Sequence, residues 1–336
     1  MWCLGNEMDG PWQLGHLSAQ EYGALANRTA AAMKMADPTL ELVVCGSSNS
    51  GMPTFGEWER LVLEASYANV DYISCHAYYQ ERGGDLGSFL ATSLDMQFFI
   101  DQVVATADHV KHKLRSDKTM MVSFDEWNVW DSYSFEAAGG THVTDEWRFA
   151  PRIIEDVYSV ADAVVVGSLL ITLLKNSDRV TSASLAQLAN VIAPIMTEPG
   201  GPAWRQTIFY PFSITSRLAA GQVLRPRVSS PSYGTKLHGE APIIDSVATL
   251  AGDRGAVFLI NRDQTQARSV SIDAASLGVT GVVEAWTLAD DDHYATNTLA
   301  EPDRVTPTAN DSVSLDSGTI TITLPPVSWT ALAFTV

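Results

Sequence analysis

The chain has 336 residues, with 39 acidic side chains against 21 lysines and arginines, which gives a formal net charge of -18. This length is enough for two hydrophobic cores. The negative excess argues against nucleic acid and anionic membranes as partners, because both would repel such a surface, and it suits a neutral substrate.

The sequence contains no run of about 18 apolar residues that would span a membrane. Its first residues carry neither the basic region nor the apolar core of a signal peptide. We therefore expect a cytoplasmic protein. Cys3, Cys45 and Cys75 each stand in or beside an apolar run, so we expect buried, reduced thiols rather than disulfides or metal ligands.

The first two thirds of the chain alternate between strand-like and helix-like patterns. Short apolar or β-branched runs predict strands at residues 2–4, 40–45, 70–75, 119–124 and 163–170. Apolar residues at helical spacing predict helices at residues 18–35, 57–68, 90–114, 151–161, 184–193 and 208–218. Ser18, with Glu21 three residues later, is typical of a helix start. Strands that alternate with helices and read as unbroken apolar runs indicate a buried parallel sheet.

From about residue 220 the pattern changes to short strands separated by Gly, Asp, Asn and Pro turns. These strands are expected at residues 223–228, 242–250, 256–261, 269–273, 282–288, 319–324 and 328–335. Strands at this spacing without intervening helices predict an antiparallel β-sandwich. We therefore expect an α/β domain over residues 1–218 and an all-β domain over residues 219–336.

Two glutamates stand at the carboxyl ends of predicted strands, where barrel enzymes carry their catalytic groups. Glu7 follows the first strand, and Glu126 follows the strand at residues 119–124. Two carboxyl groups from different strands are what glycoside hydrolysis requires, one to protonate the leaving oxygen and one to attack or to activate water. Asn6 adds an amide beside Glu7. Flat faces for a sugar ring follow the same strands, at Tyr78, Tyr79, Trp127 and Trp130.

Each of these features also has a structural explanation. Strand-end glutamates are common, aromatic clusters more often belong to a core, and His76 fits an ordinary histidine at a strand end. Asp9 fits a cap of the turn after Glu7. The triplet at residues 145–147 repeats Asp-Glu-Trp but follows no apolar strand, so we interpret it as a loop. His109 and His112 have helical spacing without an evident carboxylate partner, which favours a solvated face over a metal site.

Longer motifs resemble those of one enzyme family. In chain order they are GNEMDGPWQ at residues 5–13, ISCHAYY at 73–79, FDEWNVW at 124–130, AQLANVIAPI at 186–195, AWRQTIFYPF at 203–212 and LPPVSW at 324–329. Through these motifs the chain resembles the α-L-arabinofuranosidases of glycoside hydrolase family 51. The resemblance implies part of a TIM (β/α)8 barrel followed by a jelly-roll-like antiparallel β-sandwich.

The resemblance also implies roles for the candidate site residues. Glu7 would be the general acid/base and Glu126 the nucleophile of a retaining, exo-acting α-L-arabinofuranosidase that acts on arabinan or arabinoxylan oligosaccharides. The charge of Glu126 would raise the pKa of Glu7. The residues implied around the sugar are Asn6 at its 2-hydroxyl, His76 and Tyr78 beside Glu126, Trp130 as a wall, and Gln187. No metal and no other cofactor are implied.

The resemblance begins at the fourth barrel strand of the family. We therefore expect residues 1–218 to hold strands 4 to 8 and to lack the N-terminal part of the barrel, which in the family supplies an Arg, an Asn and a Glu to the sugar site. Such a sheet exposes two edges. Four alternatives stay open: a fragment of a longer enzyme, an enzyme completed by homo-oligomerisation or by association with the missing barrel half, a catalytically inert partial barrel, and a related retaining xylosidase or endoglucanase.

Overall fold

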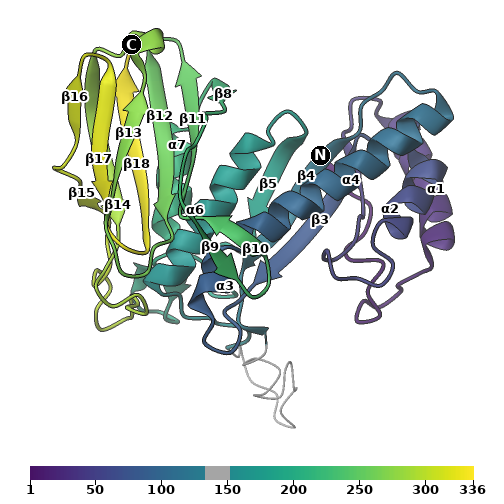
Figure 1. The fold of residues 1–336 in the computed structure, drawn as a ribbon. Coiled ribbons are helices and arrows are strands. Elements are labelled where there is room, and N and C mark those ends of the chain that lie inside the picture. Colours follow the sequence, from purple (N-terminus) through teal and green to yellow (C-terminus); the bar gives the residue numbers. More distant parts are fainter. Residues whose placement is uncertain (133–151) are drawn as a thin grey trace. The chain divides into compact units, whose positions relative to one another are not determined.

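A computed structural model describes residues 1–132 and 152–336 (Figure 1). The chain divides into two compact units. Unit 1 comprises Met1–Tyr78, Asp95–Asn128 and Asn176–Ala186, and unit 2 comprises Tyr79–Leu94, Val129–Lys175 and Gln187–Val336. The predicted loop at residues 145–147 lies outside the described residues. The predicted domain boundary after residue 218 falls within unit 2 and stays a prediction.

Unit 1 is built on a five-stranded sheet with the order β1-β2-β3-β4-β5. Its strands are β1 (Trp2–Cys3), β2 (Leu42–Val44), β3 (Tyr72–Tyr79), β4 (Met121–Val129) and β5 (Val180–Leu185). The pairs β1–β2, β2–β3 and β4–β5 are parallel, in agreement with the prediction of a parallel sheet. Strands in sequential order with helices between them form a partial (β/α) barrel.

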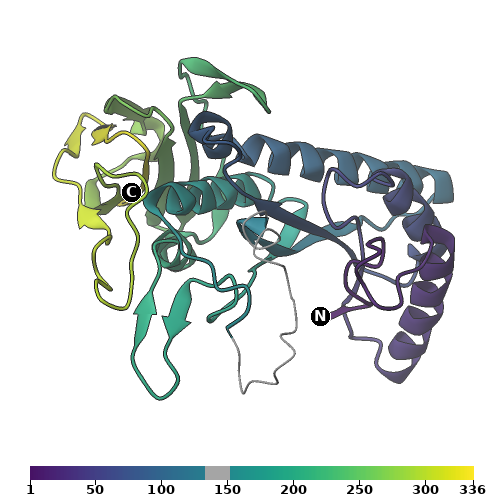
Figure 2. The same cartoon turned by 90° about the horizontal axis from the view of Figure 1, so that it is seen from below.

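Three helices accompany this sheet: α1 (Ala19–Ala36), α2 (Glu57–Ser66) and α4 (Ser93–Leu114). α1 begins as predicted, because the Ser18 hydroxyl accepts from the Glu21 N–H while the Glu21 carboxylate accepts from the Ser18 N–H. α1 and α2 lie side by side in both views (Figures 1 and 2). Gly23 permits this approach, since a Cβ at this position would stand 3.2 Å from the Val62 Cα.

Unit 2 contains the β-rich part of the chain and the helices α3 (Leu86–Leu90), α6 (Val160–Lys175) and α7 (Phe209–Leu218). A six-stranded sheet has the order β15-β14-β18-β12-β11-β8, and a three-stranded sheet has the order β13-β17-β16. Two further pairs are β6–β7 and β9–β10. The strands are β6 (Ile195–Thr197), β7 (Ala203–Arg205), β8 (Gln222–Leu224), β9 (Ser232–Thr235), β10 (Gly239–Pro242), β11 (Ile244–Ala251), β12 (Arg254–Asn261), β13 (Arg268–Asp273), β14 (Gly281–Leu288), β15 (Thr308–Ala309), β16 (Ser314–Asp316), β17 (Thr319–Leu324) and β18 (Ser328–Thr335).

The described pairings among these strands are antiparallel, which confirms the predicted antiparallel character of the C-terminal part. Apolar side chains from both larger sheets form one core, including Leu259 on β12, Ile322 on β17 and Leu332 on β18. α6 lies against this part of the chain. At Gly167 a Cβ would stand 2.1 Å from the Trp329 ring, so only glycine permits the close packing of α6 on β18.

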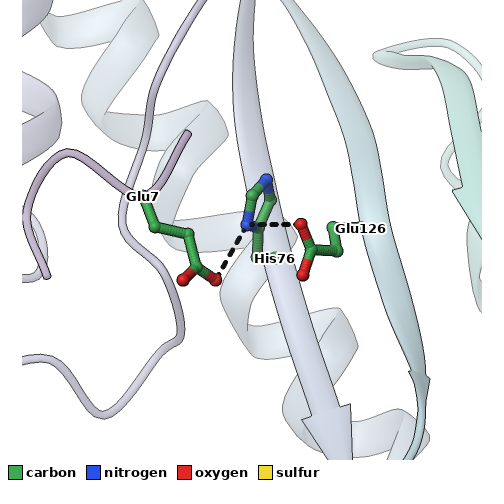
Figure 3. Close-up of side chains that lie close together, drawn as sticks. All are labelled: Glu7, His76 and Glu126. Carbon is green, nitrogen blue, oxygen red and sulfur yellow. Dashed lines mark hydrogen bonds and ion pairs between the residues drawn. The ribbon is translucent and has the colours of Figure 1, made fainter. Parts of the chain in front are cut away.

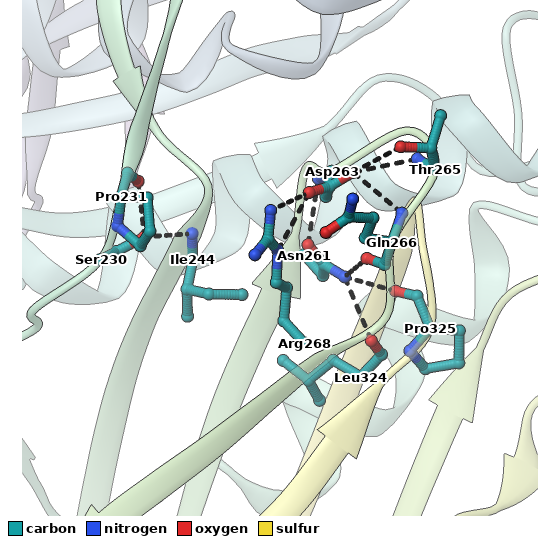
Figure 4. A network of polar contacts seen from close by, with 10 residues as sticks. All are labelled: Ser230, Pro231, Ile244, Asn261, Asp263, Thr265, Gln266, Arg268, Leu324 and Pro325. Atoms are coloured by element: carbon teal, nitrogen blue, oxygen red, sulfur yellow. Dashed lines mark hydrogen bonds and ion pairs between the residues drawn. The ribbon is translucent and has the colours of Figure 1, made fainter.

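The turn after β12 is held by side-chain amide and carboxylate groups (Figure 4). The Asn261 amide donates to the carbonyl oxygens of Gln266, Leu324 and Pro325 at 2.7 to 3.1 Å, and so links this turn to the end of β17. Asp263 accepts from the Gln266 N–H at 2.9 Å and pairs with Arg268. This network fixes the connection from β12 to β13.

Three predicted elements are wrong. Residues 163–170, predicted as a strand, lie within α6. Residues 152–159 of the predicted helix 151–161 are not helical, and residues 184–193 contain the end of β5 followed by non-helical chain. The fifth strand of the sheet is instead residues 180–185. α6 misled the prediction because thirteen of its sixteen residues are buried, and a run that is apolar on every side has no period that separates helix from strand.

Candidate active site

The loop that follows β1 carries Glu7 and is tied to its neighbours. The Leu4 carbonyl oxygen accepts from the Tyr22 hydroxyl of α1 at 3.0 Å. Asp9 accepts from the Ser48 N–H at 3.0 Å and also from the Ser48 hydroxyl, so it anchors the loop to the segment after β2. This contact replaces the turn-capping role considered for Asp9. Glu7 has φ of +45°, a backbone conformation that non-glycine residues adopt rarely and that often marks a functional position.

His76, on β3, is the centre of the site (Figure 3). Its Nδ1 lies 3.1 Å from Glu7 Oε1 and 3.6 Å from Glu126 Oε2. Its Nε2 lies 3.1 Å from Asp125 Oδ1. The His76 side chain is only 7 % exposed, so three carboxylates from two segments of the chain surround one buried imidazole.

Asp125 and Glu126 reach this imidazole from consecutive positions of β4. Successive side chains of a regular strand point to opposite faces, so adjacent residues do not normally share a site. Here Phe124 pairs with Ala183 and Trp127 pairs with Leu185, so three steps along β4 match two steps along β5. The extra residue makes a β-bulge that contains Asp125 and Glu126 and allows both carboxylates to face His76.

The surrounding carboxylates give His76 a stable positive charge. Burial lowers the pKa of an imidazolium, but the hydrogen bonds to Asp125 and Glu7 and the charge of Glu126 outweigh it and raise the pKa of His76 to about 10. Tyr78, also on β3, donates its hydroxyl to Glu126 Oε1 at 2.6 Å. Burial and the charge of Glu126 raise the pKa of Tyr78, so this phenol stays a donor.

The pKa of Glu7 differs from the prediction. Burial favours its neutral form, but hydrogen bonds from His76 and from the Trp12 indole N–H, which lies 2.6 Å from Glu7 Oε2, together lower its pKa. The predicted increase caused by Glu126 is therefore wrong for this arrangement, because the protonated His76 stands between the two glutamates. Glu7 is ionised at neutral pH.

The nearest donor atoms of Glu7, His76 and Glu126 all lie within 4.8 Å of one another. This spacing would suit a small cation as well as a proton-bearing cluster. A metal on His76 Nδ1 needs that nitrogen to be unprotonated, whereas carboxylates on both ring nitrogens favour the imidazolium, in which both nitrogens donate. We therefore interpret the cluster as an acid/base site. The site places the carboxyl group of Glu7 near the carboxyl group of Glu126, and both accept hydrogen bonds. Nucleophilic and general acid/base catalysis require such a pair.

Comparison with known proteins shows the family of this chain. Residues 125–328, more than half of the chain, match the family described as the α-L-arabinofuranosidase C-terminal domain. The chain belongs to the α-L-arabinofuranosidase family. The match begins at Asp125, so it includes the bulge of β4.

Individual α-L-arabinofuranosidases are similar along nearly the whole chain. An intracellular exo-α-(1→5)-L-arabinofuranosidase of Streptomyces lividans is 54% identical over 333 residues, which cover 99% of this chain and 50% of the relative. An exo-α-(1→6)-L-arabinofuranosidase of Bifidobacterium longum is 53% identical over 342 residues, which cover 99% of this chain and 65% of the relative. The chain thus spans between half and two thirds of the length of these relatives.

A solved structure supports the same relationship. The structure of a family 51 α-L-arabinofuranosidase from Bifidobacterium longum superposes with a TM-score of 0.94 at 46% identity, and the match covers 99% of this chain and 66% of that chain. At this similarity the fold of the described residues is that of the corresponding part of an α-L-arabinofuranosidase.

The residues implied by the α-L-arabinofuranosidase resemblance fall into two groups. Glu7, His76, Tyr78 and Glu126 meet in unit 1, as described above. Asn6 directly precedes Glu7 and is exposed. The other two residues belong to unit 2: they are Trp130, the first residue after β4, and Gln187, whose N–H donates to the Ile192 carbonyl at 3.1 Å. Gln187 lies in a loop and not in the predicted helix.

Three further residues contact the cluster and were not predicted. Asp125 binds His76, Trp12 binds Glu7, and the Cys3 thiol donates to Asp125 Oδ2 at 3.2 Å. Cys3 is exposed and not buried as expected, whereas Cys45 and Cys75 are buried and all three thiols are free. Asp125 lies inside the motif at residues 124–130, but regular strand alternation would direct it away from Glu126, and only the bulge brings both side chains to His76.

Proposed function

We propose that the chain carries the catalytic centre of a retaining, exo-acting α-L-arabinofuranosidase of glycoside hydrolase family 51, which removes terminal arabinofuranosyl groups from arabinan or arabinoxylan oligosaccharides. The observation that supports it best is the spacing of Glu7 and Glu126, whose nearest donor atoms lie within 4.8 Å. Retaining enzymes hold their carboxyl groups about 5 to 5.5 Å apart, whereas inverting enzymes leave about 6.5 to 9.5 Å for a water molecule. The names of the relatives supply the sugar and the exo mode of action.

In the proposed reaction Glu126 attacks the anomeric carbon and the bond to the leaving oxygen breaks. Glu7 gives a proton to that oxygen, so the leaving group departs as a neutral alcohol and a glycosyl-enzyme ester remains on Glu126. Glu7 then takes a proton from water, whose oxygen attacks the same carbon, so Glu126 is released as a carboxylate and Glu7 regains the proton that it gave to the leaving oxygen. The Tyr78 hydroxyl orients Glu126 through its hydrogen bond of 2.6 Å. No cofactor or metal takes part in these steps.

The sugar is held in the proposal by polar and aromatic groups around the carboxylates. Asn6 binds the 2-hydroxyl, Trp130 forms a wall of the sugar site, and Gln187 contacts the sugar from its loop. The relatives named intracellular enzymes also support action inside the cell. A neutral oligosaccharide suits the acidic chain, which carries a formal net charge of -18.

The test is hydrolysis of an aryl α-L-arabinofuranoside, with proton NMR spectra recorded during the first turnovers. We expect the α-anomer of arabinose to appear first and to mutarotate later. First appearance of the β-anomer would rule out retention. An aryl β-D-xyloside, used in parallel, separates the proposal from a related retaining xylosidase, which would hydrolyse the xyloside faster.

A second candidate is a partial barrel that is inert on its own and serves as a sugar-binding or assembly subunit. It is favoured by the five-stranded sheet of unit 1, in which β1 and β5 are the end strands. Unpaired backbone groups at the edges of a sheet can pair with further strands, either from a second copy or from another chain. Sedimentation velocity of the chain with the aryl arabinofuranoside separates the candidates. Turnover that sediments together with the monomer or with an oligomer supports the enzyme. Sugar binding without turnover in any species supports the inert subunit.

A further inference from the structure

Every carboxylate around His76 also accepts a hydrogen bond from a neutral side chain. Glu7 accepts from the Trp12 indole, Glu126 accepts from the Tyr78 hydroxyl, and Asp125 accepts from the Cys3 thiol. Hydrogen bonds to a carboxylate favour its ionised form. The arrangement therefore consists of three acceptor carboxyl groups around one imidazole, and each of the three also accepts from a neutral donor.

The protonation states of the groups around His76 favour an imidazolium. Although Cys3 is exposed as a residue, partial burial of its thiol and the charge of Asp125 raise the pKa of that thiol to about 12, and burial raises the pKa of the nearby Cys45 thiol to about 11, so both thiols stay neutral. Tyr78 stays neutral as well. Three negative charges and an imidazolium give the cluster a formal net charge of about -2, whereas a neutral imidazole would leave three buried or half-buried anions without compensation.

This resting state conflicts with the acid role of Glu7. A general acid must carry a proton when the leaving oxygen arrives, and the free protein holds Glu7 as a carboxylate. The nearest proton is on His76 Nδ1, 3.1 Å from Glu7 Oε1, which is hydrogen-bond distance and short enough for direct transfer.

We propose that His76 stores the proton that Glu7 delivers to the leaving oxygen, and that Asp125 is the positioning residue that keeps this proton on His76 until the sugar binds. The inference rests on the proposed function and adds the origin of the catalytic proton to it.

The transfer is balanced. The Nδ1–H bond of His76 breaks and an Oε1–H bond forms on Glu7, so the imidazolium becomes a neutral imidazole and the carboxylate becomes a carboxylic acid. His76 keeps its Nε2–H on Asp125. Glu7 then passes the proton to the leaving oxygen. In the second step Glu7 removes a proton from water and returns it to Nδ1, so one catalytic cycle leaves the cluster unchanged.

Substrate binding supplies the driving force for the transfer. An aglycone next to Glu7 excludes water and takes the place of the Trp12 N–H at Oε2. Both changes raise the pKa of Glu7, since burial disfavours the anion and a donor to it is lost. Trp12 is 56% exposed, so its side chain has room to move away from Glu7.

The first test measures the proton directly, by ¹⁵N NMR of the His76 imidazole across pH in the wild-type chain and in Asp125→Asn. Asp101→Asn, an exposed aspartate on α4, is the matched control, and His76→Gln identifies the signal. We expect an imidazolium up to about pH 10 in the wild type and in the control. In Asp125→Asn the titration should move to lower pH by at least about one unit, because an opposite charge is lost. A wild-type midpoint near the ordinary value of about 6.5, or no movement in Asp125→Asn, would overturn the proposal.

The second test measures kcat/KM of Asp125→Asn against pH and leaving group. We expect the alkaline limb to move to lower pH, and the loss to be at least about tenfold greater for alkyl arabinofuranosides than for the 2,4-dinitrophenyl compound, which departs without a proton. An equal loss for both leaving groups would point to a structural role and contradict the proposal. If the wild-type chain hydrolyses neither compound, the proposed function fails, while the ¹⁵N titration still decides where the proton rests.

Discussion

Two buried cations, one in each unit, are held in opposite ways. In unit 1 both ring nitrogens of His76 face carboxylates. In unit 2 the side chain of Arg262 is 0% exposed and faces mainly neutral oxygens. It donates at 2.8 to 2.9 Å to Leu90 O, Pro242 O, Ser93 Oγ and Ser168 Oγ.

The carboxylate nearest to Arg262 is farther away and already engaged. Asp245 stands 3.9 Å from the guanidinium and is itself paired with Lys175. Burial lowers the pKa of Arg262, but a guanidinium keeps its proton at any pH a protein experiences. In contrast, the acids around His76 raise its pKa in spite of burial.

The difference separates structural from chemical use of a buried charge. Neutral carbonyl and hydroxyl acceptors hold Arg262 in one position and cannot take its proton, so it joins α3, α6 and the start of α4 to the β-rich part. Acidic acceptors hold His76 equally well but can exchange a proton with it. Changes around His76 should therefore alter activity and titration, and changes around Arg262 should alter stability.

The largest effect is expected at the nucleophile. Glu126→Gln should lower kcat for an aryl α-L-arabinofuranoside by at least about 10³-fold, because an amide cannot form the glycosyl ester. The thermal midpoint should stay the same or rise, since one of three clustered negative charges is removed. Glu57→Gln, an exposed glutamate on α2, should leave both quantities unchanged. A large loss of stability in Glu126→Gln would break the distinction between the two cations.

The second prediction concerns Arg262→Ala. Four acceptors and Asp245 lose their buried donor, which should cost about 3 to 5 kcal/mol of unfolding free energy. Hydrogen exchange of amides on β11 and β12 measures the loss within unit 2. Arg268→Ala is the matched control, because this arginine is 32% exposed and should cost about 1 kcal/mol or less. Equal costs for the two variants would contradict the structural role assigned to Arg262.

A half-buried acid in unit 2 gives the third prediction. Asp162 accepts from the Ser159 N–H before α6, and burial, with smaller contributions from Asp156 and Glu81, raises its pKa to about 6. A raised pKa means that the folded chain binds this proton more tightly, so Asp162 favours folding at low pH and this contribution is lost between about pH 4 and pH 6.

Replacement of Asp162 should remove that dependence. In Asp162→Asn the unfolding free energy should rise relative to wild type by about 2 to 3 kcal/mol between pH 4 and pH 6. Urea unfolding at four pH values measures it. Parallel curves for the two proteins would show that folding does not raise the pKa of Asp162 and would contradict this prediction.

The smallest effect is expected at Trp12. Trp12→Phe removes the indole donor from Glu7 and should raise the pKa of Glu7, because a hydrogen bond to the charged form is lost. A ¹³C titration of the Glu7 carboxyl measures the change without turnover. Trp2→Phe, with a side chain that is 60% exposed, is the control and should leave the titration unchanged. No shift in Trp12→Phe would assign the low pKa of Glu7 to His76 alone.

Local signals in the sequence predicted much of the fold. The Ser18 cap predicted the start of α1, and alternation between strands and helices predicted the parallel sheet up to β4. The prediction failed where burial is complete: the run at residues 163–170 is apolar because α6 is covered on nearly every side, and its helical period is hidden. The fifth strand was missed for the opposite reason, since residues 181–184 of β5 are half-buried or exposed and carry no apolar run.

The site residues that lie at or after predicted strand ends could be predicted from the sequence. Glu7, His76, Tyr78 and Glu126 follow or end strands and stand in motifs, and the structure brings them together. Asp125 was not predicted, because strand alternation directs it away from Glu126 and a bulge is invisible in a single sequence. The pKa of Glu7 was predicted in the wrong direction because the charge of the intervening His76 was not considered.

The bulge in β4 also limits where a residue can be deleted from this strand. Phe124 and Trp127 are both fully buried, so they fix the two ends of the bulge in the core. The only residues between them are Asp125 and Glu126, so removal of one residue would restore regular alternation and keep both aromatic anchors but would eliminate one of the two carboxylates. A deletion here would therefore leave a folded chain with half of its acid pair, whereas a deletion in the turns of unit 2 would leave the pair intact. Gaps in alignments of related chains should accordingly avoid residues 124–127 and collect outside β4.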